Sequence, residues 1–188
     1  MPKVSAPQVL IPLAQGCEEL EAITIIDLLR RAGIEVTSAG LDTRSVTASR
    51  GVTLIPDTDL ESALKSDYDM IVLPGGLPGA DYLNDDKRII SVLKKMANDD
   101  KYTTAICAAP KVLATAGVLA GKTVTSYPGT LDSLGLSDTT LSDEAVVRDG
   151  KVITSRGPGT AMDFALELIE VLSGKDKRNE VETALVKS

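Results

Sequence analysis

Cys107 is the residue in this chain best placed to act as a nucleophile. It follows the strand-like run 103–106 and precedes the Ala-Ala-Pro run 108–110, so a strand is expected to turn sharply into a helix at the cysteine. Small neighbours permit such a strained elbow, and a nearby helix N-terminus lowers the pKa of a thiol. The sequence therefore predicts a nucleophilic Cys107 that is a thiolate at neutral pH. The alternative is a buried structural cysteine, because cysteine also packs as a small apolar residue.

Glu21 is the candidate acid and base. It shares a helical stripe with Ile25 and Leu28, four and seven residues further on. A carboxyl on an apolar stripe is partly desolvated, which raises its pKa, and in its protonated form it could donate a hydrogen bond to a thiolate or an oxidised sulfur. The alternative is a first-turn acid that stabilises the helix dipole, a role for which Glu18 and Glu19 are better suited.

Backbone N–H groups are the candidates for stabilising an oxyanion. Gly75-Gly76 follows the apolar run 70–73, and its free N–H groups, with that of Ala108, would suit this role. The alternative is a tight turn that binds no ligand. The Gly-Pro-Gly-Thr run 157–160 lacks the spacing of a dinucleotide or P-loop fingerprint and indicates a helix start. Two arginines either bind an anion or pair with surface acids: Arg50 and Arg156.

The absence of histidine excludes several classes of site. With no histidine among 188 residues, Ser-His-Asp and Cys-His catalysis and histidine-containing metal sites cannot form. Two cysteines cannot close a cysteine-rich zinc site. We therefore expect no metal and no organic cofactor, and acid–base chemistry carried by Glu, Asp, Lys, Tyr or Cys.

Charge and cysteine usage limit the partners and the compartment. The net charge of −7, from 20 basic and 27 acidic residues, argues against specific nucleic-acid binding. No apolar run approaches the roughly 20 residues of a bilayer span, so no membrane association is expected. Two cysteines and no signal peptide argue against a disulfide framework and favour a reducing, cytoplasmic location.

Strands and helices alternate along the chain. The expected strands are 8–14, 34–41, 70–73, 103–106 and 123–126, with hairpins around 50–51 and 149–150. The expected helices are 18–32, 60–66, 87–97, 110–116, 157–172 and one from about 175 onward. This order predicts one α/β domain over residues 1–188, with a mostly parallel sheet covered by helices on both faces. Ligands bind such sheets at the carboxyl ends of strands, where the glycine pair and Cys107 lie.

Five segments together resemble the ThiJ/PfpI superfamily, in the branch of the parkinsonism-associated protein deglycase. The resemblance covers nearly the whole chain and is carried by the runs 16–21, 26–34, 72–76, 105–110 and 154–160, in the family's order. It implies a flavodoxin-like sandwich and a homodimer. It also implies that Cys107 is the nucleophile, Glu21 its carboxyl partner, and the backbones of Gly76 and Ala108 the oxyanion donors. The implied substrate-binding residues are Arg50, Arg156, Gly75 and Tyr127.

The chain departs from the family's pattern at three positions. Tyr127 stands where many members carry a histidine, which weakens a reading as a protease or amidotransferase. Ala48 and Ile55 replace cysteines found in some members, so oxidation is expected to concentrate on Cys107.

Two functions follow from the resemblance. The first is a cofactor-independent glyoxalase and protein deglycase, acting on small reactive aldehydes such as methylglyoxal and on glycated groups. Cys107 would attack the aldehyde and Glu21 would move protons during rearrangement. The alternative is a non-enzymatic redox sensor or stress chaperone in which oxidation of Cys107 is the switching event. Both use the same residues, so the sequence leaves the two open.

Overall fold

A seven-stranded sheet forms the centre of the protein in the computed structural model, which describes residues 5–42 and 45–187. The strand order is β10-β11-β7-β6-β1-β2-β5. All neighbouring strands are parallel except β10 and β11, which form the antiparallel hairpin expected around Asp149-Gly150. The strands are β1 (Gln8–Leu13), β2 (Glu35–Gly40), β5 (Thr58–Asp59), β6 (Met70–Leu73), β7 (Tyr102–Ile106), β10 (Val146–Asp149) and β11 (Val152–Ser155).

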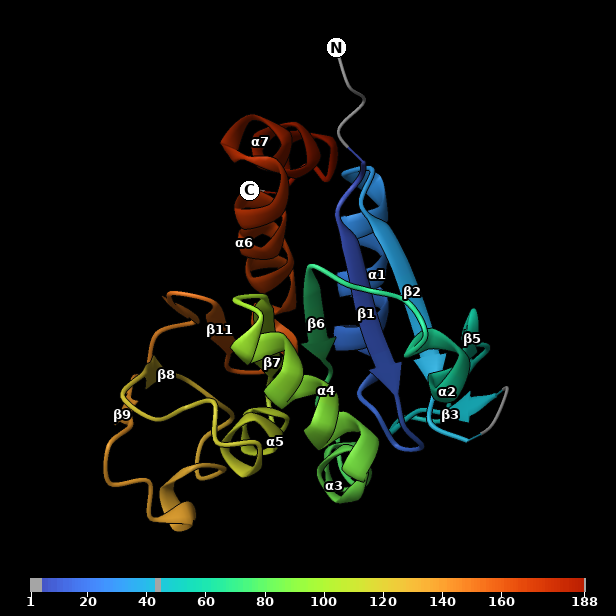
Figure 1. The fold of residues 1–188 in the computed structure, drawn as a ribbon. Coiled ribbons are helices and arrows are strands. Elements are labelled where there is room, and N and C mark those ends of the chain that lie inside the picture. The colour runs from blue at the N-terminus through green and yellow to red at the C-terminus, as the bar shows by residue number, and fades with distance from the viewer. Residues whose placement is uncertain (1–4, 43–44, 188) are drawn as a thin grey trace.

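Two small two-stranded sheets lie beside the main one (Figure 1). β3 (Val46–Thr47) and β4 (Thr53–Leu54) pair antiparallel, as the expected hairpin around Arg50-Gly51 requires. β8 (Thr123–Val124) and β9 (Thr140–Leu141) pair in parallel.

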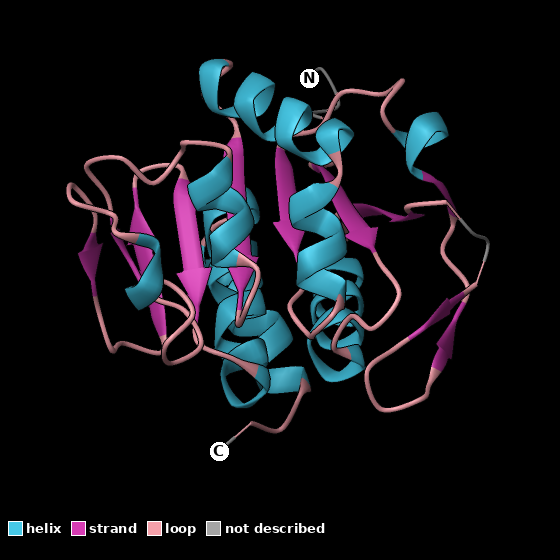
Figure 2. Cartoon of the chain, turned by 90° about the horizontal axis from the view of Figure 1, so that it is seen from below, coloured by secondary structure: helices cyan, strands magenta, loops and turns pink. Residues whose placement is uncertain are grey.

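Helices cover both faces of the sheet, and Figure 2 shows the strands between them. One hydrophobic cluster joins the sheet to α1 (Glu19–Arg31), α6 (Ala161–Ser173) and α7 (Lys175–Ala184). A second cluster joins the opposite face to α2 (Leu60–Ala63), α3 (Gly79–Asp85), α4 (Lys87–Asn98) and α5 (Pro110–Thr115). Short 3₁₀ turns occupy Asp132–Leu134 and Pro158–Thr160. None of the helices in the described ranges combines the length and apolar character that a membrane span requires.

The alternating α/β architecture expected from the sequence is confirmed, and the differences lie in its short elements. The sequence did not predict α3, β5, β9 or the 3₁₀ turn at 132–134. These elements are too short to show a hydrophobic periodicity in the sequence. The expected helix 157–172 begins at Ala161, since its first turn is the 3₁₀ segment.

Because the strands are parallel, the candidate site residues lie together at one edge of the sheet. The arrowheads of β1 and β6 point the same way in Figure 1, and Cys107 follows β7 at that same carboxyl edge. Gly75 follows β6, and α1 begins shortly after β1 ends. Three neighbouring strands therefore deliver the glycine pair, the cysteine and the start of α1 to one place.

Candidate active site

Cys107 lies in a strained elbow between β7 and α5. Its φ of 64° is in the left-handed region that residues other than glycine rarely adopt. Its N–H donates to the Ser155 carbonyl at 3.0 Å, and its carbonyl accepts from the Tyr127 N–H at 2.8 Å. These two backbone bonds hold the elbow, so the strand-to-helix turn expected from the sequence is confirmed.

Glu21 is fully buried in the first turn of α1 and faces the elbow. Its Oε2 accepts a hydrogen bond from the Gly75 N–H at 2.8 Å. Its carboxyl lies beside the Cys107 thiol, close enough for each group to shift the pKa of the other. The other oxygen, Oε1, is buried without a hydrogen-bond partner. A carboxyl in these surroundings is more easily kept neutral than charged.

The two glycines after β6 let the backbone pass close to both side chains. A Cβ on Gly75 would lie 2.6 Å from the Cys107 Cβ and 2.9 Å from the Glu21 Oε2. Gly76 has a φ of +87°, and a Cβ there would lie 2.4 Å from the Glu18 backbone nitrogen. Both positions therefore require glycine.

Backbone N–H groups of Gly76 and Ala108 lie beside the Cys107 sulfur and lower the pKa of its thiol. The sequence proposed these two groups as oxyanion donors, and the structure brings them together with Cys107. Donors at this position stabilise negative charge on the sulfur and on an oxygen bound next to it.

Burial is the main cause of the raised pKa of the Glu21 carboxyl. It raises the pKa of the carboxyl from the usual 4.5 to about 7, against the lowering effect of hydrogen bonds from Gly75 and Cys107. Charge on neighbouring Glu18 acts in the same direction as burial. Near neutral pH, Glu21 can therefore both accept and return a proton.

The structure does not favour the thiolate that the sequence predicted at Cys107, although a helix begins nearby. Burial and the charge of ionised Glu21 raise the pKa of the Cys107 thiol to about 12, and the Gly76 and Ala108 N–H groups only partly oppose this. Burial raises the pKa of Cys17 to about 12 as well. The prediction of a thiolate at Cys107 at neutral pH is therefore wrong, because burial and the neighbouring carboxylate favour the protonated thiol. Since the charge of Glu21 contributes to the raised pKa of the thiol, proton uptake by Glu21 favours ionisation of Cys107, and the two groups titrate together.

The two implied substrate-binding arginines lie in different parts of the fold. Arg156 lines a cavity of about 240 Å³ with Tyr127, and its Nη1 binds the Asp143 carboxylate at 2.6 Å. Cys107 is not among the residues that line this cavity. Arg50 lies exposed on the β3–β4 hairpin, where its backbone N–H donates to Glu19 at 2.9 Å.

Two supports of the site were not singled out from the sequence. Ser49 Oγ donates to the Glu18 carboxylate at 2.7 Å, which ties the β3–β4 hairpin to the start of α1. Ser155 is fully buried, and its hydroxyl lies 2.6 Å from that of Thr160. The sequence analysis assigned no role to either serine, and only the three-dimensional contacts reveal them.

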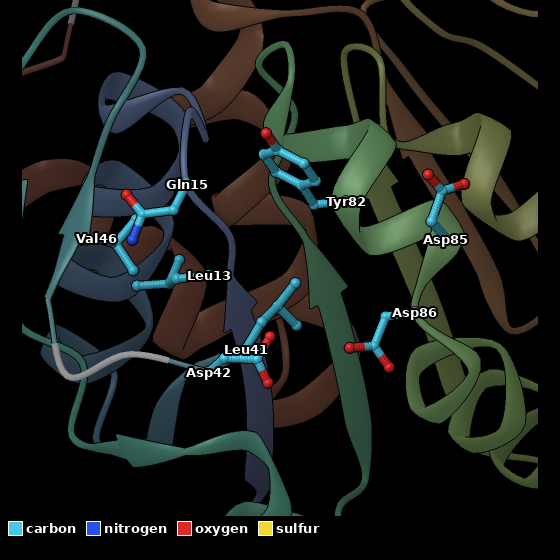
Figure 3. Close-up of a pocket in the computed structure, with 8 residues that line it drawn as sticks. All are labelled: Leu13, Gln15, Leu41, Asp42, Val46, Tyr82, Asp85 and Asp86. Carbon is cyan, nitrogen blue, oxygen red and sulfur yellow. The ribbon is translucent and has the colours of Figure 1, made fainter.

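Another cavity, of about 360 Å³, opens beside the ends of β1 and β2. Figure 3 shows Tyr82 on one wall and Gln15 with Val46 on the other, and neither Cys107 nor Glu21 lines it. The chemistry described above belongs to the elbow and not to this cavity. Within the described ranges, no three histidine, cysteine or acidic residues are grouped as a metal site would require.

Replacing Gly75 with alanine is expected to disrupt the site severely. The added methyl group would overlap the Cys107 Cβ and displace the Glu21 carboxylate, because neither the elbow nor the buried helix turn can move away. Cys107 alkylation and any cysteine-dependent turnover should fall at least about tenfold. Gly159→Ala is the matched control: like Gly75, Gly159 does not have a positive φ, and a Cβ there meets nothing within 4 Å. Equal losses in the two variants would contradict the role given to Gly75.

Comparison with known proteins places these features in one family. The sequence model of the DJ-1/PfpI family matches residues 7–171. The chain is 45% identical to the protein dj-1beta of Drosophila melanogaster over 178 residues, which cover 94% of this chain and 95% of that one. It is 36% identical over 173 residues to the glutathione-independent glyoxalase DJR-1.2 of Caenorhabditis elegans, covering 92% and 91% of the two chains.

Solved structures agree with the sequence matches. The crystal structure of Drosophila melanogaster DJ-1beta superposes with a TM-score of 0.93 and 42% identity, covering 98% of this chain and 100% of that one. An oxidized DJ-1 of Toxoplasma gondii superposes with a TM-score of 0.91 and 39% identity, covering 96% and 98%.

Proposed function

Because the chain belongs to the DJ-1/PfpI family, we propose that it is a cofactor-independent, cysteine-dependent glyoxalase and deglycase acting on methylglyoxal and its early adducts. The observation that carries the proposal is the buried Glu21 carboxyl, with its pKa near 7, beside the thiol of Cys107. A relative described as a glutathione-independent glyoxalase supports the same reaction.

The reaction begins with attack by the Cys107 sulfur on the aldehyde carbon of methylglyoxal. The thiol proton passes to Glu21 and from Glu21 to the carbonyl oxygen, which becomes the hydroxyl of a hemithioacetal and leaves Glu21 ionised. N–H groups of Gly76 and Ala108, which lower the pKa of the thiol, would stabilise the negative charge that passes from sulfur to oxygen.

Glu21 then moves a proton within the bound adduct. It removes the proton from the former aldehyde carbon and returns it to the neighbouring carbon, while the hydroxyl proton moves to the neighbouring oxygen. These two shifts convert the hemithioacetal into a lactoyl thioester. Water cleaves the thioester, releases lactate and restores the thiol. The overall balance is methylglyoxal plus water giving lactate, without an external oxidant or reductant.

The direct test of this proposal is lactate formation by the purified protein from methylglyoxal, without glutathione. We expect lactate to accumulate in step with methylglyoxal loss. Loss of methylglyoxal without lactate would contradict the proposal, because simple trapping of the aldehyde by amines and thiols consumes it but gives no lactate.

A redox role at the same cysteine is the second candidate. A structural neighbour is described as an oxidized DJ-1, and Glu21 is placed to donate a hydrogen bond to an oxidised sulfur. Peroxide would convert the Cys107 sulfur to a sulfinate, and the protonated carboxyl would stabilise that anion. This role supports a stress sensor or chaperone, and it is compatible with the enzyme.

We also propose that the protein forms a homodimer through α1 and the β3–β4 hairpin. Four large apolar side chains are exposed there, and the hairpin is hydrogen-bonded to the start of α1 through Glu19. Their exposed fractions are 51% for Leu20, 47% for Ile23, 48% for Val52 and 82% for Ile55. Leu28, on the apolar stripe of the same helix, is only 2% exposed and packs inside the protein.

Sedimentation at micromolar concentration is expected to give twice the 19.7 kDa mass of one chain. Ile55→Glu should shift the protein to the monomer, because a charge would be buried in the interface. Leu134→Glu is the control, since Leu134 is 45% exposed in the 3₁₀ turn after β8, away from the patch. A monomeric wild type would contradict the dimer.

A further inference from the structure

A basic groove lies at the sheet edge opposite Cys107. It is a cavity of about 780 Å³ at the amino ends of β7 and β11, between the carboxyl ends of α4 and α5. Five basic side chains and one acidic side chain, Asp100, line it. The basic residues are Lys94, Lys101, Lys122, Arg148 and Lys151. This concentration is unusual in a chain whose net charge is −7.

The positive charges of the groove are only partly satisfied by the protein. Arg148 and Lys151 lie 3.6 Å and 3.9 Å from the nearest carboxylate oxygens, longer than a charge-assisted hydrogen bond. The carboxylate facing Lys151 is that of Asp100, whose side chain is 85% exposed. Lys94 is exposed on α4 and forms no ion pair with any residue of the described ranges. Each of these three cations therefore has donors left for a ligand.

Helix dipoles account for only part of this cluster. The carboxyl ends of α4 and α5 face the groove, and basic side chains near such ends stabilise the helices. Arg148 and Lys151 belong instead to the β10–β11 hairpin, on the other wall. Lys151 also lies 4.2 Å from the centre of the Tyr102 ring, so an aromatic surface adjoins the charges.

We propose that this groove binds a small molecule bearing a di- or triphosphate group. Cations on two walls suit an anion with several charges spread along a chain better than a compact anion with one charge. The volume falls within the roughly 300–1,000 Å³ of small-molecule sites. The phosphate chain is either a free pyrophosphate or part of a nucleotide, whose base would lie toward Tyr102. The site is independent of the reaction at Cys107.

Calorimetric titration of the full-length protein with pyrophosphate tests the proposal. Wild type is expected to bind one equivalent at about 0.15 M salt. Lys94→Gln with Lys151→Gln should weaken binding at least about tenfold. The control is Lys87→Gln with Lys175→Gln, two exposed lysines outside the groove, which removes the same net charge and should change affinity less than about twofold.

Two more proteins and one more ligand make each outcome decisive. Lys94→Glu, at an exposed helix position without an ion pair, should weaken binding even if the double variant folds poorly. Cys107→Ala should bind pyrophosphate as wild type does. Tighter binding of ADP than of pyrophosphate identifies the nucleotide source, and equal binding identifies the phosphate chain alone.

The proposal fails if wild type binds no pyrophosphate at that salt concentration, or if the control variant loses as much affinity as the groove variant. Binding of an RNA oligomer without binding of pyrophosphate would overturn it in favour of an extended polyanion.

Discussion

Replacing Cys107 with alanine is expected to reduce lactate formation from methylglyoxal at least about a thousandfold, because the covalent route disappears with the nucleophile. The other groups of the site would remain, but the Glu21 carboxyl and the backbone donors cannot form the hemithioacetal. Initial rates of lactate release, measured without glutathione, provide the comparison.

Cys17→Ala is the matched control for this variant. Cys17 is 1% exposed, and burial likewise raises the pKa of its thiol to about 12. It lies outside the elbow, so its loss is expected to leave turnover within about threefold of wild type. If both alanine variants kept full turnover, neither cysteine would be the nucleophile. If only the Cys17 variant failed, the roles of the two residues would be exchanged.

Replacing Glu21 with glutamine is expected to lower turnover at least about a hundredfold, because an amide cannot accept and return a proton. The glutamine carbonyl can still accept the Gly75 N–H, and its NH₂ can still donate toward sulfur. Peroxide-driven sulfinate formation at Cys107 should therefore fall much less than lactate formation. Glu21→Asp shortens the reach by roughly 1.5 Å and should damage both. If the glutamine variant formed lactate at the full wild-type rate, Glu21 would not be the group that transfers the proton.

The glutamine variant should also change how stability depends on pH. The folded protein holds a proton on Glu21 up to about pH 7, whereas the unfolded chain releases it near 4.5. The stabilisation from this raised pKa is present below pH 4.5 and is lost as the pH rises through 7, a loss of about 3 kcal/mol. The Glu21→Gln variant has no such loss. Its free energy of unfolding should therefore rise relative to that of wild type between pH 5 and pH 8. Parallel stability curves for the two proteins would show that Glu21 is not desolvated.

The elements that position the site could be read from the sequence because each carries a strong local signal. α1 has acids in its first turn, Arg30 and Arg31 in its last, and Gly33 after its end. The elbow at Cys107 is marked by small residues and by Pro110 at the first position of α5. Parallel strand order then brought Glu21, the glycine pair and Cys107 to one edge.

The ionisation of the pair could not be predicted from the sequence. A helix N-terminus and small neighbours pointed to a thiolate at Cys107, but the pKa depends on how deeply the thiol is buried and on the charge beside it. Both are properties of packing between segments 54 or more residues apart, as the Gly75–Glu21 hydrogen bond illustrates. The basic groove was not predicted for the same reason, because its five cations come from α4, the residues just before β7 and β8, and the β10–β11 hairpin.

Trapping the covalent intermediate is the most direct test of Cys107 and Glu21 acting together as nucleophile and proton carrier. The protein is quenched in acid during turnover of methylglyoxal, and its peptides are mapped by mass. We predict a lactoyl thioester on Cys107 that appears before lactate, decays as substrate runs out, and is strongly reduced in Glu21→Gln. Lactate formed while Cys107 stays unmodified at every time point, or a thioester that accumulates equally in Glu21→Gln, would contradict this mechanism.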